Sequence, residues 1–369
     1  MDPRIKKLAY NLINYSTELK AGEKVLIEAV GARTFPLVEA LLAEAYAVGG
    51  LPFYLLHDDL VRRSQLLGAG MEQMELEAQF QLARMKEMDC YIGVRGSDNV
   101  LELSDVPPAG MQAMSKTVGM KVHMQERVPN TRWVVLRYPS PTFAQAAKMS
   151  THQFEDFFYD SCLLDYSKMS KAMDPLVDLM QRTDRVQLKG PGLDLSFSIK
   201  GIPAIKCDGR MNIPDGEVFT APVRDSVNGI FHSNTPTLYE GNYFNGLSFV
   251  FKDGKIVEES CEQGDAARLS EILNRDDGAR YIGEFAIGLN PFVQREMLDI
   301  LFDEKIAGSF HFTPGNAYDD ADNGNKSQIH WDIVTRQFAE SGGGEIWFDG
   351  KLIRKDGLFT LGELKPLNP

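Results

Sequence analysis

The feature that most constrains the fold is the alternation, along the first 140 residues, of short apolar segments with longer stretches of helical spacing. The apolar segments are four to six residues long and cover 25–30, 51–56, 90–94 and 133–136. The stretches with helical spacing cover 3–19, 35–48, 71–88 and 111–123. Strands of this length that alternate with helices predict a parallel sheet with both faces covered. We therefore predict an α/β N-terminal domain with a mainly parallel sheet.

A parallel sheet of this kind often binds a nucleotide at its strand-to-helix turns. The first turn reads Val30-Gly31-Ala32-Arg33, and the third reads Arg95-Gly96-Ser97. Neither contains the glycine spacing that brings a backbone close to a phosphate. The N-terminal half is therefore interpreted as a scaffold and not as a cofactor domain.

The sequence changes character in its second half. Residues 152–182 are rich in Phe, Tyr, Met and Leu with helical spacing, and Pro175 predicts a helix break or a new helix there. Residues 193–199 then alternate with the period of two that is typical of half-exposed strands. Hairpin signals follow at 252–255 and at Asp349-Gly350. We predict two domains, 1–175 and 176–369, the second with an α+β, strand-rich fold.

Composition excludes several classes of partner. The formal net charge is −13, which disfavours nucleic acid and anionic membranes because both attract basic surfaces. No apolar run approaches the ~18 residues that span a bilayer, and residues 1–16 do not resemble a signal peptide. The scattered cysteines form no CxxC pair and indicate reduced thiols in a cytoplasmic protein. They are Cys90, Cys162, Cys207 and Cys261.

Two glutamates occur in settings that strand propensity does not explain. Glu217 follows the turn Pro214-Asp215-Gly216 and opens a short apolar run, although a surface glutamate at the start of a strand would look the same. Glu284 is the single charge in the apolar segment 281–288. If both faces of that strand are buried, an ionised carboxylate there needs a cation or several hydrogen bonds. The alternative is a position on the wet face of an edge strand.

The segment 311–332 contains two of the six histidines. His311 alternates with two phenylalanines, and Tyr318 follows seven residues later. In an extended strand His330 and Asp332 point to the same side, with Trp331 opposite. An imidazole and a carboxylate on one side, near a second histidine, suit a divalent ion such as Zn or Co. The acidic run 319–324 lacks the ligand spacing of a calcium loop and is interpreted as solvated.

Together these motifs resemble the aminopeptidase T-like metallopeptidases, peptidase family M29. The resemblance covers nearly the whole chain, and 19–25 and 132–141 add to it. The loop between Tyr318 and His330 is shorter than in that family, which affects the expected substrate preference but not the site. The motifs that carry the resemblance are Pro-Asp-Gly-Glu217, Gly-Glu284-Phe-Ala-Ile-Gly, His311 with Tyr318, and His330-Trp-Asp332.

The resemblance implies two divalent metal ions of Zn, Co or Mn type. It implies that Glu284 or Asp332 bridges the ions, that the Tyr318 hydroxyl stabilises the oxyanion, and that Glu217 or Glu284 carries the proton to the leaving amine. The implied substrate is a peptide with a free N-terminus, and a homodimer is expected. The implied metal ligands are Glu217, Glu284, His311, Tyr318, His330 and Asp332.

Two further functions fit the same residues. One is another dinuclear hydrolase that acts on a different amide, and the other is a non-catalytic α/β binding protein in which these side chains are structural. Outside the motifs, we expect Arg224 to pair with Asp225 or to contact substrate, and His232 to be structural or a substrate contact. The other histidines, His57, His123 and His152, are expected to be structural or superficial.

Overall fold

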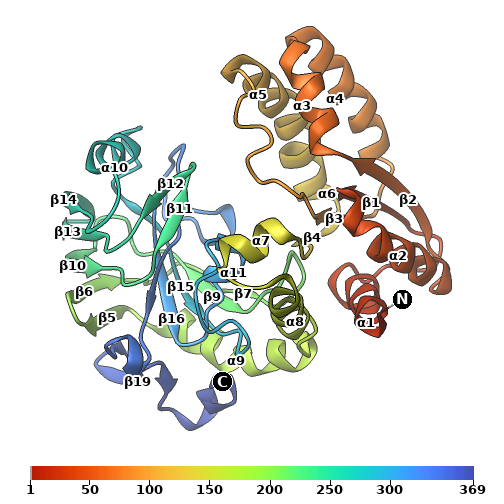
Figure 1. The fold of residues 1–369 in the computed structure, drawn as a ribbon. Helices are drawn as coiled ribbons and strands as arrows, with labels where there is room; N and C mark the ends of the chain where they lie inside the picture. The colour runs from red at the N-terminus through yellow and green to blue at the C-terminus, as the bar shows by residue number, and fades with distance from the viewer. Residues whose placement is uncertain (1) are drawn as a thin grey trace. The chain divides into compact units, whose positions relative to one another are not determined.

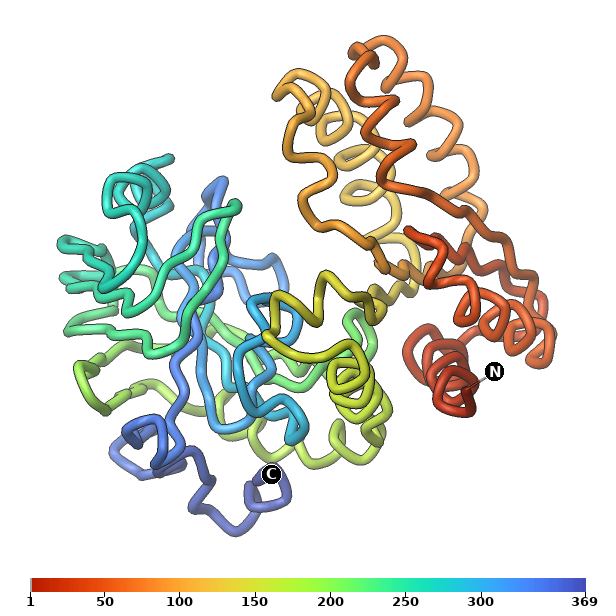
Figure 2. The backbone as a smooth tube through the Cα atoms, viewed as in Figure 1, coloured from red at the N-terminus to blue at the C-terminus, as the bar shows by residue number. Residues whose placement is uncertain are grey.

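The computed structural model describes residues 2–369, and its contacts divide the chain into two compact units (Figures 1 and 2). The first unit contains residues up to Leu164 together with Gly209–Pro214. The second contains Asp165–Asp208 together with Asp215–Pro369. The division into 1–175 and 176–369 stays a prediction, and residue 175 lies inside helix α9 (Tyr166–Arg182).

The first unit is built on a five-stranded parallel sheet, as predicted, with strand order β2-β1-β3-β4-β8. Strands β1 and β3 are buried nearly throughout because each has neighbours on both sides and helices on its faces. The edge strand β2 is largely exposed. The strands are β1 (Lys24–Val30), β2 (Leu51–His57), β3 (Cys90–Arg95), β4 (Arg132–Arg137) and β8 (Asn212–Ile213).

One face of this sheet packs against helices through Leu26, Tyr91, Met74 and Val122. Helix α3 (Asp59–Gly68) was not predicted, and its start is capped by Asp58, which accepts from the amide of Leu60. The predicted helix 3–19 is α-helical as far as Asn11 and continues as a π-helical segment to Ser16. The helical segments are α1 (Pro3–Asn11), η1 (Leu12–Ser16), η2 (Ala32–Thr34), α2 (Phe35–Ala47), α4 (Met71–Met85), α5 (Pro108–Met114), η3 (Ser115–Arg127), α6 (Val128–Asn130), α7 (Pro141–Ala146) and α8 (Thr151–Cys162).

The predicted break at Pro175 is wrong. The helices α8 and α9 are separated at 163–165, and α9 continues through Pro175 to Arg182. The apolar side chains of Met169, Met173 and Leu176 form a buried stripe along α9. Burial of that stripe offsets the hydrogen bond that a proline removes from a helix interior.

The second unit contains two large antiparallel sheets and the two-stranded sheet β11-β12, which confirms a strand-rich C-terminal region. The eight-stranded sheet has the order β14-β13-β10-β6-β5-β18-β19-β20, and the five-stranded sheet has the order β17-β16-β15-β9-β7. The strands are β5 (Arg185–Gly190), β6 (Leu193–Ser198), β7 (Ile205–Cys207), β9 (Glu217–Thr220), β10 (Asn228–His232), β11 (Thr237–Tyr239), β12 (Asn242–Phe244), β13 (Ser248–Lys252), β14 (Lys255–Ser260), β15 (Ile282–Gly288), β16 (Ser309–Pro314), β17 (Ile333–Arg336), β18 (Glu345–Phe348), β19 (Lys351–Lys355) and β20 (Leu358–Phe359). The helical segments are α9, α10 (Ala266–Leu273), α11 (Ile300–Asp303), η4 (Asp319–Ala321), η5 (Ala339–Ser341) and η6 (Gly362–Leu367).

The two sheets pack through aromatic side chains. Phe197 on β6 lies 5.1 Å from Phe285 on β15 and 5.3 Å from Phe312 on β16, measured between ring centroids. Phe231 on β10 also stacks on Phe312. Because side chains alternate along a strand, the residues next to these phenylalanines on β15 and β16 point to the opposite face of the five-stranded sheet. That face carries the candidate metal ligands.

Residues 2–369 contain no helix with the length and apolar character that a bilayer crossing requires.

Candidate metal centre

Three neighbouring strands position the first group of candidate ligands. Glu284 lies in the middle of β15, which is buried along its whole length between β9 and β16. His311 on β16 is paired with Ala286, and Glu217 on β9 is paired with Gly288. The ligand atoms of Glu217, Glu284 and His311 lie within 4.8 Å of one another. We name these three residues the first triad.

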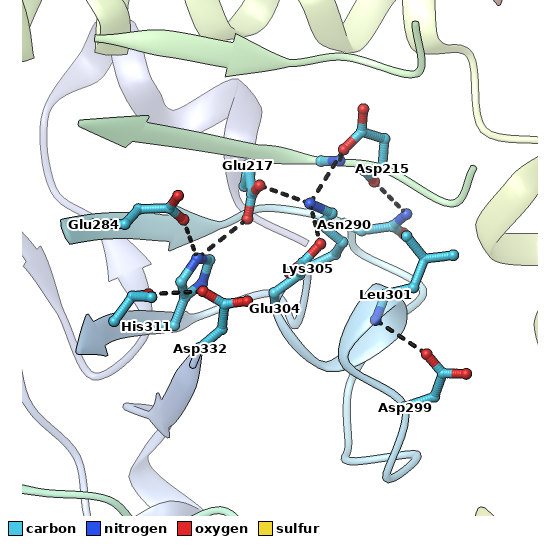
Figure 3. Close-up of polar contacts among 12 residues, drawn as sticks. Asp215, Glu217, Glu284, Asn290, Asp299, Leu301, Glu304, Lys305, His311 and Asp332 are labelled. Carbon is cyan, nitrogen blue, oxygen red and sulfur yellow. Dashed lines mark hydrogen bonds and ion pairs between the residues drawn. The ribbon is translucent and has the colours of Figure 1, made fainter. Parts of the chain in front are cut away.

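The contacts within the first triad leave lone pairs available. His311 Nε2 lies 2.7 Å from Glu284 Oε1 and 3.6 Å from Glu217 Oε2 (Figure 3). Both Glu217 Oε2 and His311 Nδ1 are buried without a hydrogen-bond partner among the residues that the structure describes. A buried carboxylate oxygen without a donor is costly, and a cation beside Glu217 Oε2 would satisfy it.

The second triad consists of Glu284, His330 and Asp332, whose ligand atoms also lie within 4.8 Å of one another. His330 Nε2 is 3.2 Å from Asp332 Oδ1 and 3.8 Å from Glu284 Oε2. The predicted same-side placement of His330 and Asp332 therefore agrees with the geometry. Glu284 belongs to both triads, with Oε1 toward the first and Oε2 toward the second.

Neighbouring groups orient the second triad. His330 Nδ1 lies 2.8 Å from the carbonyl of Asn316, which holds a ring proton on Nδ1 and directs Nε2 at the site. The Thr313 hydroxyl donates to Asp332 Oδ1 at 2.7 Å. Gly315 pairs with His330 across an isolated bridge, and its φ of 113° suits glycine. Such hydrogen bonds fix the direction in which a ligand presents its lone pair.

Electrostatics at the two triads favour positive charge. Burial alone would lower the pKa of His311, but the carboxylates of Glu284 and Glu217 outweigh it and raise the pKa to about 9. Likewise, Asp332 and Glu284 outweigh burial at His330 and raise its pKa to about 10. Burial opposes ionisation of Asp332, yet His330 holds its pKa below the usual range. Protons on the imidazoles thus balance the carboxylates, and a divalent ion would replace those protons.

Tyr318 lies beside the second triad. Its ring centroid is 4.5 Å from that of His330 and 5.9 Å from that of Phe219. The residue is 49% exposed, so its side chain is open to solvent beside the second triad. The six residues predicted from the sequence therefore come together at one face of the five-stranded sheet.

A buried lysine beside Glu217 was not predicted. Lys305 lies between α11 and β16, and its Nζ is 2.6 Å from Glu217 Oε1 and 2.6 Å from Glu304 Oε1. Burial raises the pKa of Glu304 to about 8 despite Lys305. The segment 301–308 contains no periodicity or spacing that marks Glu304 or Lys305, so the burial of these two residues is evident only in the folded structure. Thr313 was also missed, although its position two residues after His311 places it on the same face.

The remaining predicted polar residues lie outside the triads. The Arg224 guanidinium is 3.7 Å from the ring centroid of Tyr281 and donates to Asn325 Oδ1. The expected pairing of Arg224 with Asp225 is wrong, since the described residues show no such ion pair. His232 Nδ1 lies 2.8 Å from the Ser248 hydroxyl on the neighbouring strand of the eight-stranded sheet.

The other histidines follow their predicted structural or superficial roles. His57 Nε2 is 3.2 Å from Glu28 Oε1 in the first unit, and His152 is exposed. Burial lowers the pKa of His123 to about 4, so this side chain is neutral near pH 7. None of the three contributes an atom to either triad.

Sequence and structure comparisons place the chain among known proteins. The family model described as thermophilic metalloprotease (M29) matches residues 1–354. Aminopeptidase T of Thermus thermophilus is 27% identical over 410 residues, which cover 98% of this chain and 96% of that relative.

Two solved structures share the fold. Wild-type AmpT from Thermus thermophilus has a TM-score of 0.81 at 23% identity and covers 97% of this chain and 99% of its own. The 2,5-dihydroxypyridine dioxygenase from Pseudomonas putida KT2440 has a TM-score of 0.61 at 13% identity, with 98% of both chains covered. Because both identities are low, these likenesses show the fold alone, and one fold carries proteins with different names.

Proposed function

This chain belongs to the M29 family of thermophilic metalloproteases, and we propose that it is an aminopeptidase that uses two divalent metal ions. The observation that carries the proposal is the pair of triads that share Glu284. A carboxylate whose two oxygens face different ligand sets is suited to bridge two ions. Of the two bridging candidates from the sequence, Glu284 is therefore preferred over Asp332.

The donor set fits divalent transition metals. Glu217, Glu284 and His311 would hold one ion, and Glu284, His330 and Asp332 would hold the other, with Tyr318 beside the second. Carboxylate and imidazole donors suit Zn, Co and Mn. When bound, a pair of such ions acidifies water and polarises the carbonyl of a peptide bond.

The protein's own residues supply the remaining chemistry. His330, oriented by the Asn316 carbonyl, keeps Nε2 directed at the site. The Tyr318 hydroxyl can donate to the oxygen that gains negative charge when the peptide carbonyl is attacked. Glu217 or Glu284 would carry a proton to the leaving amine, and the carboxylate-rich surroundings favour a substrate with a free α-ammonium group.

The direct test measures metal content together with hydrolysis. We expect about two ions per chain, release of the first residue from a leucyl peptide, loss of that activity on chelation, and recovery with Zn or Co. An N-acetylated copy of the same peptide should remain intact, since it lacks the free amine. Glu284→Gln and His330→Ala should each reduce activity at least ~100-fold while the circular dichroism spectrum is unchanged.

Other outcomes would select the alternatives. Equal cleavage of the acetylated peptide would favour another dinuclear amide hydrolase. Metal-free protein without hydrolytic activity would favour a binding protein. We further propose that the enzyme acts in the cytoplasm as a homodimer, and sedimentation at micromolar concentration tests the dimer.

A further inference from the structure

Lys305 occupies a cage of carboxylates next to the first triad. Its side chain is fully buried, and its Nζ contacts Glu217 and Glu304 at 2.6 Å each and Asp215 Oδ1 at 3.4 Å (Figure 3). A buried ammonium group requires partners that balance its charge and accept its hydrogen bonds, and these carboxyl groups supply both. One ammonium group here faces three carboxyl groups.

The backbone holds the lysine in this cage. The amide of Asn290 donates to the carbonyl of Lys305 at 3.0 Å, and the Asn290 side chain donates to the carbonyl of Asp215 at 2.8 Å. The Tyr166 hydroxyl accepts from the amide of Asp215. Both sides of the cage are thus tied to the same asparagine, which fixes the backbone of Lys305 relative to that of Asp215.

The contact divides the two oxygens of Glu217. Oε1 accepts from the ammonium, while Oε2 is buried, has no hydrogen-bond partner among residues 2–369 and lies 3.6 Å from His311 Nε2. Glu217 can therefore offer one oxygen to an ion, and the charge on that oxygen is already shared with Lys305. A divalent ion at the first triad would also lie near a fixed positive charge, which repels it.

The second triad differs in this respect. Among the described residues, the ion pairs of Glu284, His330 and Asp332 are with histidines that would themselves be ligands, and none is with a lysine or an arginine. An ion at the first triad would therefore lie beside the ammonium group of Lys305, which contacts Glu217, whereas an ion at the second triad would have no such neighbour in contact with its own ligands His330 and Asp332.

On the basis of the proposed two-metal site, we infer that Lys305 is a built-in counter-ion that makes the two metal positions unequal. The first triad holds its divalent ion more weakly than the second, and Lys305 is the positioning residue that sets the difference. The consequence is an enzyme whose second-triad ion stays bound while its first-triad ion exchanges with solution.

Zinc titration of the full-length, metal-free protein tests this inference, with a coloured chelator as competitor. We expect two binding classes whose dissociation constants differ at least tenfold. Lys305→Met, which keeps the length but removes the charge, should tighten the weaker class at least tenfold and leave the tighter class unchanged. Lys305→Arg, which keeps the charge, should preserve the inequality.

Two ligand variants identify the classes without changing the lysine. Glu217→Gln should remove the weaker class, and Asp332→Asn should remove the tighter one. The inference is overturned if Lys305→Met weakens or does not change the weaker class, or if Asp332→Asn removes the weaker class instead. If Lys305→Met does not fold, the two ligand variants still show which triad is the weaker position, and a weaker second triad overturns the inference. Wild-type protein that binds no zinc in either class would instead refute the proposed function.

Discussion

Replacement of Thr313 by valine tests how strongly the protein scaffold controls metal affinity at the second triad. The Thr313 hydroxyl is fully buried and donates to Asp332 Oδ1 at 2.7 Å, and Thr313 faces Glu284 across the β15–β16 pair. Valine has nearly the same shape, so the change removes one hydrogen bond and leaves the packing intact. Asp332 keeps its charge but loses the group that fixes its direction.

The expected magnitudes follow from the type of bond. A hydrogen bond to a charged group contributes about 1.5–3 kcal/mol, so metal-free Thr313→Val should lose about 2 kcal/mol of unfolding free energy. For a unit of this size that loss lowers Tm by roughly 4–8 °C. Loss of a partner that orients a ligand typically weakens metal affinity about 10- to 100-fold. We expect the dissociation constant for zinc at the second triad to rise about tenfold.

The matched control is Thr220→Val. Thr220 is equally buried, on strand β9 of the same sheet, but its hydroxyl has no hydrogen-bond partner in the described part of the chain. Its replacement should change the unfolding free energy by less than about 1 kcal/mol and leave zinc affinity unchanged. Competition titration and thermal unfolding measure both quantities. Wild-type zinc affinity and stability in Thr313→Val, or equal losses in both variants, would refute the reasoning.

Three further predictions concern other parts of the structure. Glu28 accepts a hydrogen bond from the Tyr91 hydroxyl at 2.7 Å. Although burial opposes the ionisation of Glu28, His57 and other partners lower its pKa. Its contribution to the unfolding free energy is therefore present above the unfolded pKa of about 4.3 and is lost as pH falls below it. Glu28→Gln should therefore cost about 3 kcal/mol of unfolding free energy at pH 7, and the difference from wild type should shrink in urea melts below pH 4. A Cβ at Gly315 would lie 2.1 Å from the Ile329 carbonyl oxygen, so Gly315→Ala should lower stability by more than about 2 kcal/mol and weaken zinc binding; an unchanged melting curve would contradict this. Tyr318→Phe should lower kcat about 100-fold with Tm within about 1 °C of wild type, and undiminished kcat would remove the hydroxyl from the mechanism.

Much of the candidate site follows from local sequence. The alternation of His311 with Phe310 and Phe312 predicts a strand with one polar and one aromatic face, and the aromatic face packs against the eight-stranded sheet. The spacing of His330 and Asp332 predicts their shared side. For Glu284 the sequence leaves two alternatives, a buried ligand and a wet edge position. Its place on a central strand, between β9 and β16, removes the second alternative.

Other parts of the site depend on distant segments. Lys305 and Glu304 follow a four-residue helix whose local sequence predicts neither burial nor ionic contacts. The ion pairs of Lys305 with Asp215 and Glu217 bring together segments that are about 90 residues apart in the chain. A charged side chain in an irregular segment is usually solvated, so no local rule predicts that this lysine is buried.

The sequence by itself determined the local elements and the types of donor. Periods of two and of about 3.6 residues specify which side chains share a face, because backbone geometry sets these periods within a few residues. The tertiary structure alone decided which strands are neighbours and in what register. A shift of one residue between β15 and β16 would turn His311 away from Glu284. Burial of the phenylalanines between the two sheets fixes that register, and the same burial holds carboxylates, imidazoles and one ammonium group close together on the opposite face.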